Sequence, residues 1–184
     1  MSQKEIYNKV YKDVAGYNSS KTTRYDEKDV VVLDYLSRAN GTLLDAGCGT
    51  GHNLQIAISL GIDAFGIDIS DECCRRFLNN LPHQCIDIVG FCKQNRKFDN
   101  IICTDVLEHI KKDNLDETLE YISNISPSAL FGIANHEDNL LGIELHLIQE
   151  NKEWWIQKLS NFYGSTIVKK ELFKGTFFFI ECEK

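Results

Sequence analysis

The chain has no apolar run that approaches the roughly 18 residues of a membrane-spanning helix, and it has no excess of positive charge. Its first residues, Met1–Glu5, are polar, unlike the apolar centre of a signal peptide. The formal net charge is −7, whereas nucleic-acid-binding surfaces are usually clustered basic faces. We therefore expect a cytoplasmic protein that binds neither a membrane nor nucleic acid.

Paired cysteine motifs are also missing. The seven cysteines are odd in number, and no two of them have the Cys-x-x-Cys spacing of a zinc or redox site. We expect them to be reduced and mostly buried. The chain also lacks internal repeats, low-complexity segments and linkers, so its 184 residues predict a single domain.

Short apolar segments alternate with helical patterns along most of the chain. Strands are expected at 43–45, 63–67, 84–89, 98–103, 129–134, 165–170 and 176–182. Helices are expected at 4–13, 26–39, 52–60, 70–78, 113–122 and 150–163. This alternation predicts an α/β fold with a parallel sheet covered by helices on both faces. The link between the last two strands is too short for a parallel crossover, so that pair should be antiparallel.

A glycine-rich segment, residues 43–52, follows the first expected strand. Gly47, Gly49 and Gly51 have the spacing Gly-x-Gly-x-Gly. Glycine permits close approach of the backbone to a ligand, and ligands of open α/β sheets lie at the carboxyl ends of the strands. The segment lacks the Gly-x-Gly-x-x-Gly fingerprint, and His52 stands where a phosphate-binding loop has lysine. The segment therefore predicts a ligand-binding loop of another kind.

Acidic residues end the next expected strands. Asp68 comes about 20 residues after the first glycine, where an acid can accept both hydroxyls of a ribose, or be an ordinary turn residue. Asp87 lies in the third strand region, as a ligand contact or as a solvated residue. The pattern favours a nucleoside ligand.

Three motifs together resemble those of class I S-adenosylmethionine-dependent methyltransferases. They are Leu-Asp-Ala-Gly-Cys-Gly-Thr-Gly at 44–51, Gly-Ile-Asp-Ile-Ser at 66–70, and the segment from Phe98 to Ile110. The resemblance covers roughly residues 40–135. It implies a Rossmann-like doubly wound seven-stranded sheet, mostly parallel with the last strand antiparallel. It also implies an enzyme that uses S-adenosylmethionine and releases S-adenosylhomocysteine.

The resemblance also implies which residues hold the cofactor. The amino acid part would face Asp45, Gly47, Cys48 and Gly49, the ribose and adenine would lie against Asp68, Ile69, Asp87 and Ile88, and Thr104 would lie under the methionine chain. Residues 1–40 would form amino-terminal helices and a lid, 41–135 the cofactor-binding core, and 136–184 the acceptor side and closing hairpin. In the lid, Arg24 could pair with the methionine carboxylate, or be solvated surface.

Three histidines follow the strands that face the acceptor. Methyl transfer requires a positioned nucleophile and, for some acceptors, a base, for which histidine is the usual residue. His109, His136 and His146 are therefore the candidate catalytic residues, and packing is the alternative role of each.

Asp105-x-x-Glu108-His109 resembles the Glu-x-x-Glu-His segment that binds a divalent metal in small-RNA 2′-O-methyltransferases and in quinone-pathway O-methyltransferases. His146 could add a ligand, and such a set suits Mg²⁺, Mn²⁺ or Zn²⁺. The chain departs from the pattern by having Asp105 in its first position, so we expect no metal and keep one as an alternative.

The sequence thus predicts methyl transfer to an oxygen or nitrogen of a small-molecule acceptor, by a monomer or homodimer. Residues 136–150 and the amino-terminal segment would cover the acceptor pocket. Two alternatives remain: a metal-assisted RNA 2′-O-methyltransferase, and a module that binds S-adenosylmethionine without turnover.

Overall fold

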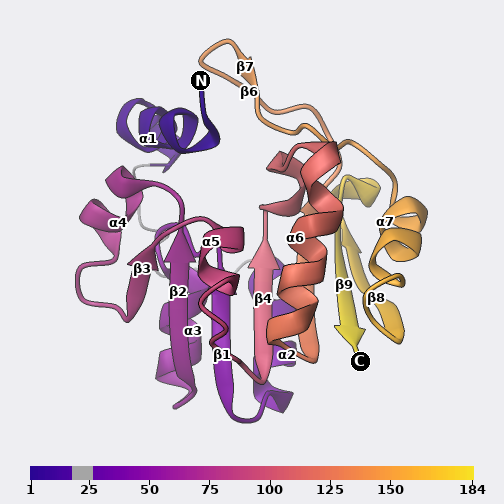
Figure 1. The fold of residues 1–184 in the computed structure, drawn as a ribbon. Coiled ribbons are helices and arrows are strands. Elements are labelled where there is room, and N and C mark those ends of the chain that lie inside the picture. The colour runs from indigo at the N-terminus through magenta and orange to yellow at the C-terminus, as the bar shows by residue number, and fades with distance from the viewer. Residues whose placement is uncertain (18–26) are drawn as a thin grey trace.

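The computed structural model describes residues 1–17 and 27–184, and a seven-stranded sheet runs through its centre (Figure 1). The order of strands in the sheet is β3-β2-β1-β4-β5-β9-β8. In chain order these are β1 (Thr42–Ala46), β2 (Asp63–Asp68), β3 (His83–Cys85), β4 (Asn100–Thr104), β5 (Ser128–Ala134), β8 (Ser165–Leu172) and β9 (Phe177–Glu183). The first five pair in parallel, and β9 is antiparallel to both β5 and β8. The predicted Rossmann-like sheet with an antiparallel last strand is confirmed.

Helices cover both faces of the sheet (Figure 1). In chain order they are α1 (Gln3–Asp13), α2 (Glu27–Arg38), α3 (His52–Ser59), α4 (Asp71–Phe77), α5 (Ile88–Cys92), α6 (Lys112–Ile125) and α7 (Lys152–Leu159). Three short 3₁₀ turns are η1 (Ala15–Tyr17), η2 (Leu107–His109) and η3 (Phe173–Gly175). Helices α5, α6 and α7 lie on one face, and α2 and α3 on the other. Within residues 1–17 and 27–184, no helix is both long and apolar enough to span a membrane.

The alternation of side chains along the strands builds two cores. Leu44 and Ala46 of β1 pack in the cluster that contains Trp155 of α7. Leu43, the neighbour of Leu44, points to the opposite face and packs in the other cluster with Leu36 of α2 and Leu54 of α3. Successive strand residues point to opposite faces, so a strand buried on both sides must be mostly apolar, as residues 43–46 of this one are apart from Asp45.

The third strand differs from the prediction. A strand over 84–89 was expected, but β3 ends at Cys85 and the short helix α5 begins at Ile88. Asp87, expected in the strand region, is the N-cap of α5 instead, because its Oδ1 accepts a hydrogen bond of 2.8 Å from the backbone amide of Gly90. A carboxylate that satisfies the first amides of a helix stops the strand at this point.

A second difference is a small hairpin after β5, formed by β6 (Asn139–Leu140) and β7 (Ile143–Glu144). Its two turn residues, Leu141 and Gly142, both have positive φ, of 55° and 74°. Such turns usually carry Asn-Gly or Asp-Gly, so leucine hid the turn from the sequence. The expected helix at 150–163 is shorter, and Arg24 and Asp26 lie outside the described residues.

The glycine loop is held against β2. The backbone amides of Gly47 and Cys48 both donate to the carbonyl of Ile67, at 2.8 and 2.9 Å. Gly66 lies where this contact is tightest: a Cβ there would be 2.8 Å from Cys48 Sγ and 2.8 Å from Leu54 Cδ2. The loop can therefore approach β2 closely because residue 66 has no side chain.

We expect Gly66→Ala to lower the free energy of unfolding by about 1–3 kcal/mol, because the added methyl group overpacks this contact. Urea unfolding of both proteins measures the change. Gly16→Ala is the matched control, because a Cβ at Gly16 meets no described atom within 4 Å. Equal stability of the Gly66 variant and the wild type would show that the loop has room to shift.

Candidate active site

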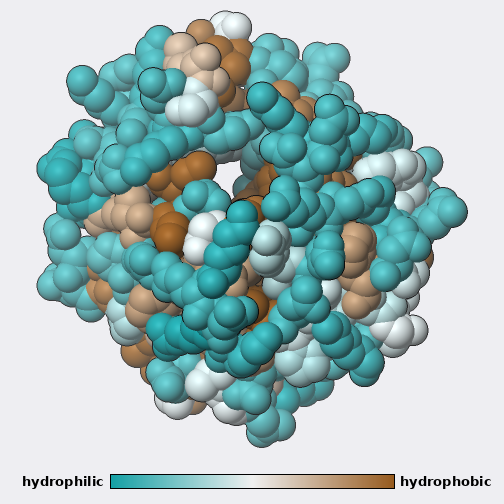
Figure 2. Space-filling view, in the orientation of Figure 1, coloured by the Kyte–Doolittle hydropathy of each residue, from teal (hydrophilic) through white to brown (hydrophobic). Residues whose placement is uncertain are grey.

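A cavity of about 940 Å³ lies at the carboxyl ends of β1, β2 and β4. In the space-filling view, a hollow opens in the upper part of the molecule, bordered partly by hydrophobic residues (Figure 2). Residues from the glycine loop, from α1 and η1, and from the segment after β5 all line the cavity. This is the edge of a parallel sheet at which ligands bind in such folds.

Asp68 joins the glycine loop to the start of α4. Its Oδ2 accepts from the amide of Gly49 at 3.0 Å, and its Oδ1 accepts from the amide of Ser70 at 2.8 Å. Burial raises the pKa of the carboxyl, and the two amide hydrogen bonds oppose that rise. Each carboxylate oxygen can accept a further hydrogen bond, so Asp68 can also accept from a ligand hydroxyl in the cavity that it lines.

Most of the residues expected to hold the cofactor line this one cavity. They are Gly47, Cys48, Gly49, Asp68, Ile69, Asp87, Ile88 and Thr104. Hydrophobic side chains gather at the end formed by the carboxyl side of β2 and β3, which contributes Ile69, Ile86 and Ile88. Thr104 lies at the opposite end, and its hydroxyl accepts from Asn53 Nδ2 at 3.3 Å.

Asp45 differs from the other expected cofactor residues, because it lies beneath the loop and is not among the described residues that line the cavity. Asp45 is only 1% exposed, and its Oδ2 has no hydrogen-bond partner within the described chain. Burial, together with the charge of Asp68, raises its pKa to about 7, and the backbone amide of Leu54 acts in the opposite direction.

The three candidate catalytic histidines form one cluster. The ring centroids of His109 and His146 are 4.7 Å apart, and those of His136 and His146 are 4.8 Å apart. His109 and His146 are buried, and His136 is exposed. All three line the cavity. They come from η2 and from the segment that contains the β6–β7 hairpin, elements far apart in the sequence.

Backbone carbonyls orient the two buried rings. His109 Nδ1 lies 3.0 Å from the carbonyl oxygen of Leu145, and His146 Nδ1 lies 2.6 Å from that of His136. A carbonyl can only accept, so each Nδ1 carries a proton and each neutral ring keeps its lone pair on Nε2. Burial and His146 lower the pKa of His109 to about 4.

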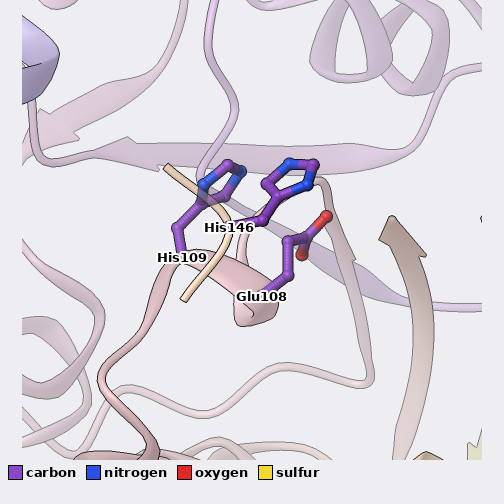
Figure 3. A group of neighbouring side chains, drawn as sticks. All are labelled: Glu108, His109 and His146. Atoms are coloured by element: carbon purple, nitrogen blue, oxygen red, sulfur yellow. The ribbon is translucent and has the colours of Figure 1, made fainter. Parts of the chain in front are cut away.

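Glu108, which belongs to the segment that resembles a metal-binding motif, lies beside this pair. Its Oε1 accepts from the amide of Ala134 at 2.8 Å, while Oε2 has no hydrogen-bond partner among the described residues. Burial and the charge of Asp105 raise its pKa to about 8. One ligand atom each from Glu108, His109 and His146 lie within 4.8 Å of one another (Figure 3). Asp105 is outside this group, and its carboxylate contacts Lys28 Nζ at 2.9 Å.

Helix α1 covers the cavity from above. Gln3 Nε2 donates to the carbonyl of His109 at 2.8 Å, and Tyr7 makes an edge contact with the His109 ring, with centroids 5.6 Å apart. Asn8 Oδ1 accepts from the Ser70 hydroxyl at 2.9 Å. The family resemblance implied an amino-terminal segment over the cofactor, but it did not imply these polar contacts.

Known structures share this fold over nearly the whole chain. Magnesium protoporphyrin IX methyltransferase from Synechocystis PCC 6803, with bound SAM, has a TM-score of 0.67 and 16% identity, covering 100% of this chain and 98% of that one. The DhpI–SAH complex has a TM-score of 0.73 and 17% identity, with coverage of 100% and 98%. The small RNA methyltransferase HEN1 has a TM-score of 0.65 and 17% identity, covering 90% of this chain and 27% of that one. At these identities the likeness concerns the fold.

Sequence comparison shows the family. No curated protein matches the chain in sequence, but a model of the methyltransferase domain family matches residues 22–172. The chain belongs to this family, and together with the fold this makes it a class I S-adenosylmethionine-dependent methyltransferase. The predictions of an enzyme, of S-adenosylmethionine as cofactor and of S-adenosylhomocysteine as product are confirmed.

We expect Asp45→Asn to reduce the pH dependence of stability. The unfolded chain loses the Asp45 proton near pH 3.8 and the folded chain near pH 7, so this residue makes the wild type less stable as pH rises through that window. Asparagine has no such proton, so the variant should gain roughly 1–4 kcal/mol relative to the wild type across the window. Urea unfolding at a series of pH values measures this. A constant difference between the two proteins would contradict a protonated Asp45.

Proposed function

We propose that the protein transfers the methyl group of S-adenosylmethionine to an oxygen or nitrogen of a small-molecule acceptor, whose reactive atom lies against the histidine cluster. One observation carries this proposal: His109, His136 and His146 line the same cavity as the glycine loop. We further assign residues 1–40 as a lid, 41–135 as the cofactor-binding core and 136–184 as the acceptor side.

The cavity offers a different environment to each part of the cofactor. The adenine would lie at the hydrophobic end, against Ile69 and Ile88, and Asp68 would accept from the ribose hydroxyls. The amino acid part would cross the amides of Gly47 and Gly49 toward Thr104. In this orientation the methyl group would point toward the side of the cavity that holds the histidines, all three of which line it.

Methyl transfer is a displacement at the methyl carbon. A bond forms from the acceptor atom to that carbon while the bond to sulfur breaks, and sulfur keeps the electron pair. The cofactor supplies the leaving group, so the protein chiefly positions the acceptor and removes its proton. The Nε2 lone pairs of His109 and His146 can take that proton, because both Nδ1 atoms are held by carbonyls, although a pKa of about 4 makes His109 a weak base at neutral pH. His136 connects the buried pair to solvent.

The proposal predicts that His146→Ala and His109→Ala lower kcat by about 10²–10⁴-fold while the affinity for S-adenosylmethionine is preserved. An acceptor screen with mass-spectrometric detection of products heavier by one methylene identifies the substrate for this measurement. His83→Ala is the control, because His83 lies on β3 and does not line the cavity within the described chain. Normal turnover by both variants would place the base elsewhere. Tight cofactor binding without any turnover would favour a non-catalytic module.

A second candidate function is divalent-metal-assisted methylation, with an RNA end as one acceptor. The observation that favours it is the convergence of Glu108, His109 and His146, in which Glu108 Oε2 has no other partner in the described structure. Metal-binding histidines commonly donate their second ring N–H to a carbonyl, as both histidines do here. These three residues would hold the ion, which would lower the pKa of a bound hydroxyl.

We expect Mg²⁺ or Mn²⁺ to bind the wild type in calorimetric titrations if this second candidate is correct, and Glu108→Gln to weaken binding by at least tenfold, because it removes the only anionic ligand of the group. Asp113→Asn, an exposed acid at the start of α6, is the matched control. Undiminished turnover in EDTA, with no heat of metal binding, would exclude a metal. Adding a short RNA to the acceptor screen tests the RNA alternative.

A further inference from the structure

An acidic side chain that the reaction described above does not use lies beside the histidine cluster. Asp138 precedes the β6–β7 hairpin and lines the same cavity as the three histidines. Its side chain is 24% exposed, and its Oδ2 lies 3.9 Å from Nε2 of His146. Within the described chain, its carboxylate makes no hydrogen bond and no ion pair with a lysine or arginine. Asp138 therefore presents an accessible carboxylate to the cavity.

The histidine rings near Asp138 present lone pairs to the cavity. His136 follows the arrangement of the other two rings, because its Nδ1 lies 2.9 Å from the carbonyl oxygen of Glu137. Each neutral ring therefore has its lone pair on Nε2. His146 is 5% exposed, and the 3.9 Å from its Nε2 to Asp138 Oδ2 is too long for a shared proton. Two hydrogen-bond acceptors thus lie side by side, and neither has a donor within the described chain.

The negative charge of Asp138 is felt on this side of the cavity. Lys28, which also lines the cavity, already pairs with both carboxylate oxygens of Asp105, at 3.1 and 2.9 Å. Burial and the charge of Asp138 raise the pKa of Tyr17 to about 12. Tyr17 and Tyr7 both line the cavity, and aromatic side chains are common neighbours of bound ammonium groups. These features suit a cationic ligand with several N–H donors.

We propose that the acceptor is a primary or secondary amine, whose ammonium group binds between Asp138 Oδ2 and His146 Nε2. This inference rests on the proposed function and names its substrate class. An ammonium group has two or three N–H donors, so it satisfies both atoms at once and balances the charge of Asp138. An alcohol has a single O–H donor and satisfies only one of them. A carboxylate would be repelled by Asp138.

The transfer step balances with the histidine base of the proposed function. The ammonium group gives one proton to Nε2 of His146, and the neutral amine keeps an N–H donor to Asp138. The nitrogen lone pair then forms the bond to the methyl carbon while the bond from that carbon to sulfur breaks, and sulfur keeps the electron pair. The product is a methylated ammonium group, whose positive charge Asp138 continues to balance.

Calorimetric titrations of the protein loaded with S-adenosylhomocysteine test this inference with three matched ligands: 2-phenylethylamine, 2-phenylethanol and 3-phenylpropanoate. EDTA is present, so that no divalent ion occupies the His146 lone pair. We expect the wild type to bind the amine about tenfold more tightly than the alcohol, and to bind the carboxylate most weakly.

Asp138→Asn should remove this preference, because the amide keeps the shape of the side chain and loses its charge. The amine and the alcohol should then bind within about threefold of each other. Glu137→Gln is the matched control, because Glu137 is the exposed neighbouring acid and does not line the cavity within the described chain. The control should keep the preference of the wild type.

Equal binding of the amine and the alcohol by the wild type would overturn the inference, whether or not the variant folds. Tighter binding of the carboxylate, binding of none of the three ligands, or a preference that survives in Asp138→Asn would also overturn it. The acceptor screen separates the inference from the proposed function. Methyl transfer to alcohols or carboxylates but to no amine would overturn the inference alone. An amine preference that depends on Asp138, in a protein without turnover, would support the ammonium site and overturn methyl transfer.

Discussion

The hydrogen bonds of one carboxylate hold one side of the cavity together. Asp68 ends β2 and accepts from the amides of Gly49 and Ser70, so it fixes the glycine loop and the start of α4 at once. The Ser70 hydroxyl caps α4 and also donates to Asn8 of α1. The strand, the glycine loop and the start of α4 therefore meet around the Asp68 side chain, and α1 joins them through Ser70.

The parts of the structure that repeat a simple pattern could be predicted from sequence. Strand β1 has apolar side chains on both faces. The spacing of Gly47 and Gly49 indicates the ligand-binding loop, and the position of Asp68 indicates its acidic partner. The competition between strand and helix over residues 86–88 could not be predicted in the same way. Ile86, Asp87 and Ile88 alternate like a strand, but the Asp87 carboxylate satisfies an amide of α5 and ends the strand region earlier.

Long-range contacts were the least predictable part of the site. His109 and His146 are far apart in sequence, and their rings meet because Leu145 and His136 offer carbonyls to the two Nδ1 atoms. The spacing of apolar residues along the chain does not indicate such a contact between distant segments. The buried state of Glu108 was hidden for the same reason, since an acid after a strand usually faces solvent.

The polar attachment of α1 has a consequence for what holds this helix in place. Three hydrogen bonds hold the helix above the cavity. Gln3 donates to the carbonyl of His109, the Ser70 hydroxyl donates to Asn8, and Arg76 of α4 donates to the carbonyl of Tyr11. Each of these groups finds water as an alternative partner, so lifting the helix costs little net hydrogen bonding. Val10 and Tyr11 of α1 are buried, so the main cost of displacing this helix is the lost burial of those two side chains rather than its hydrogen bonds.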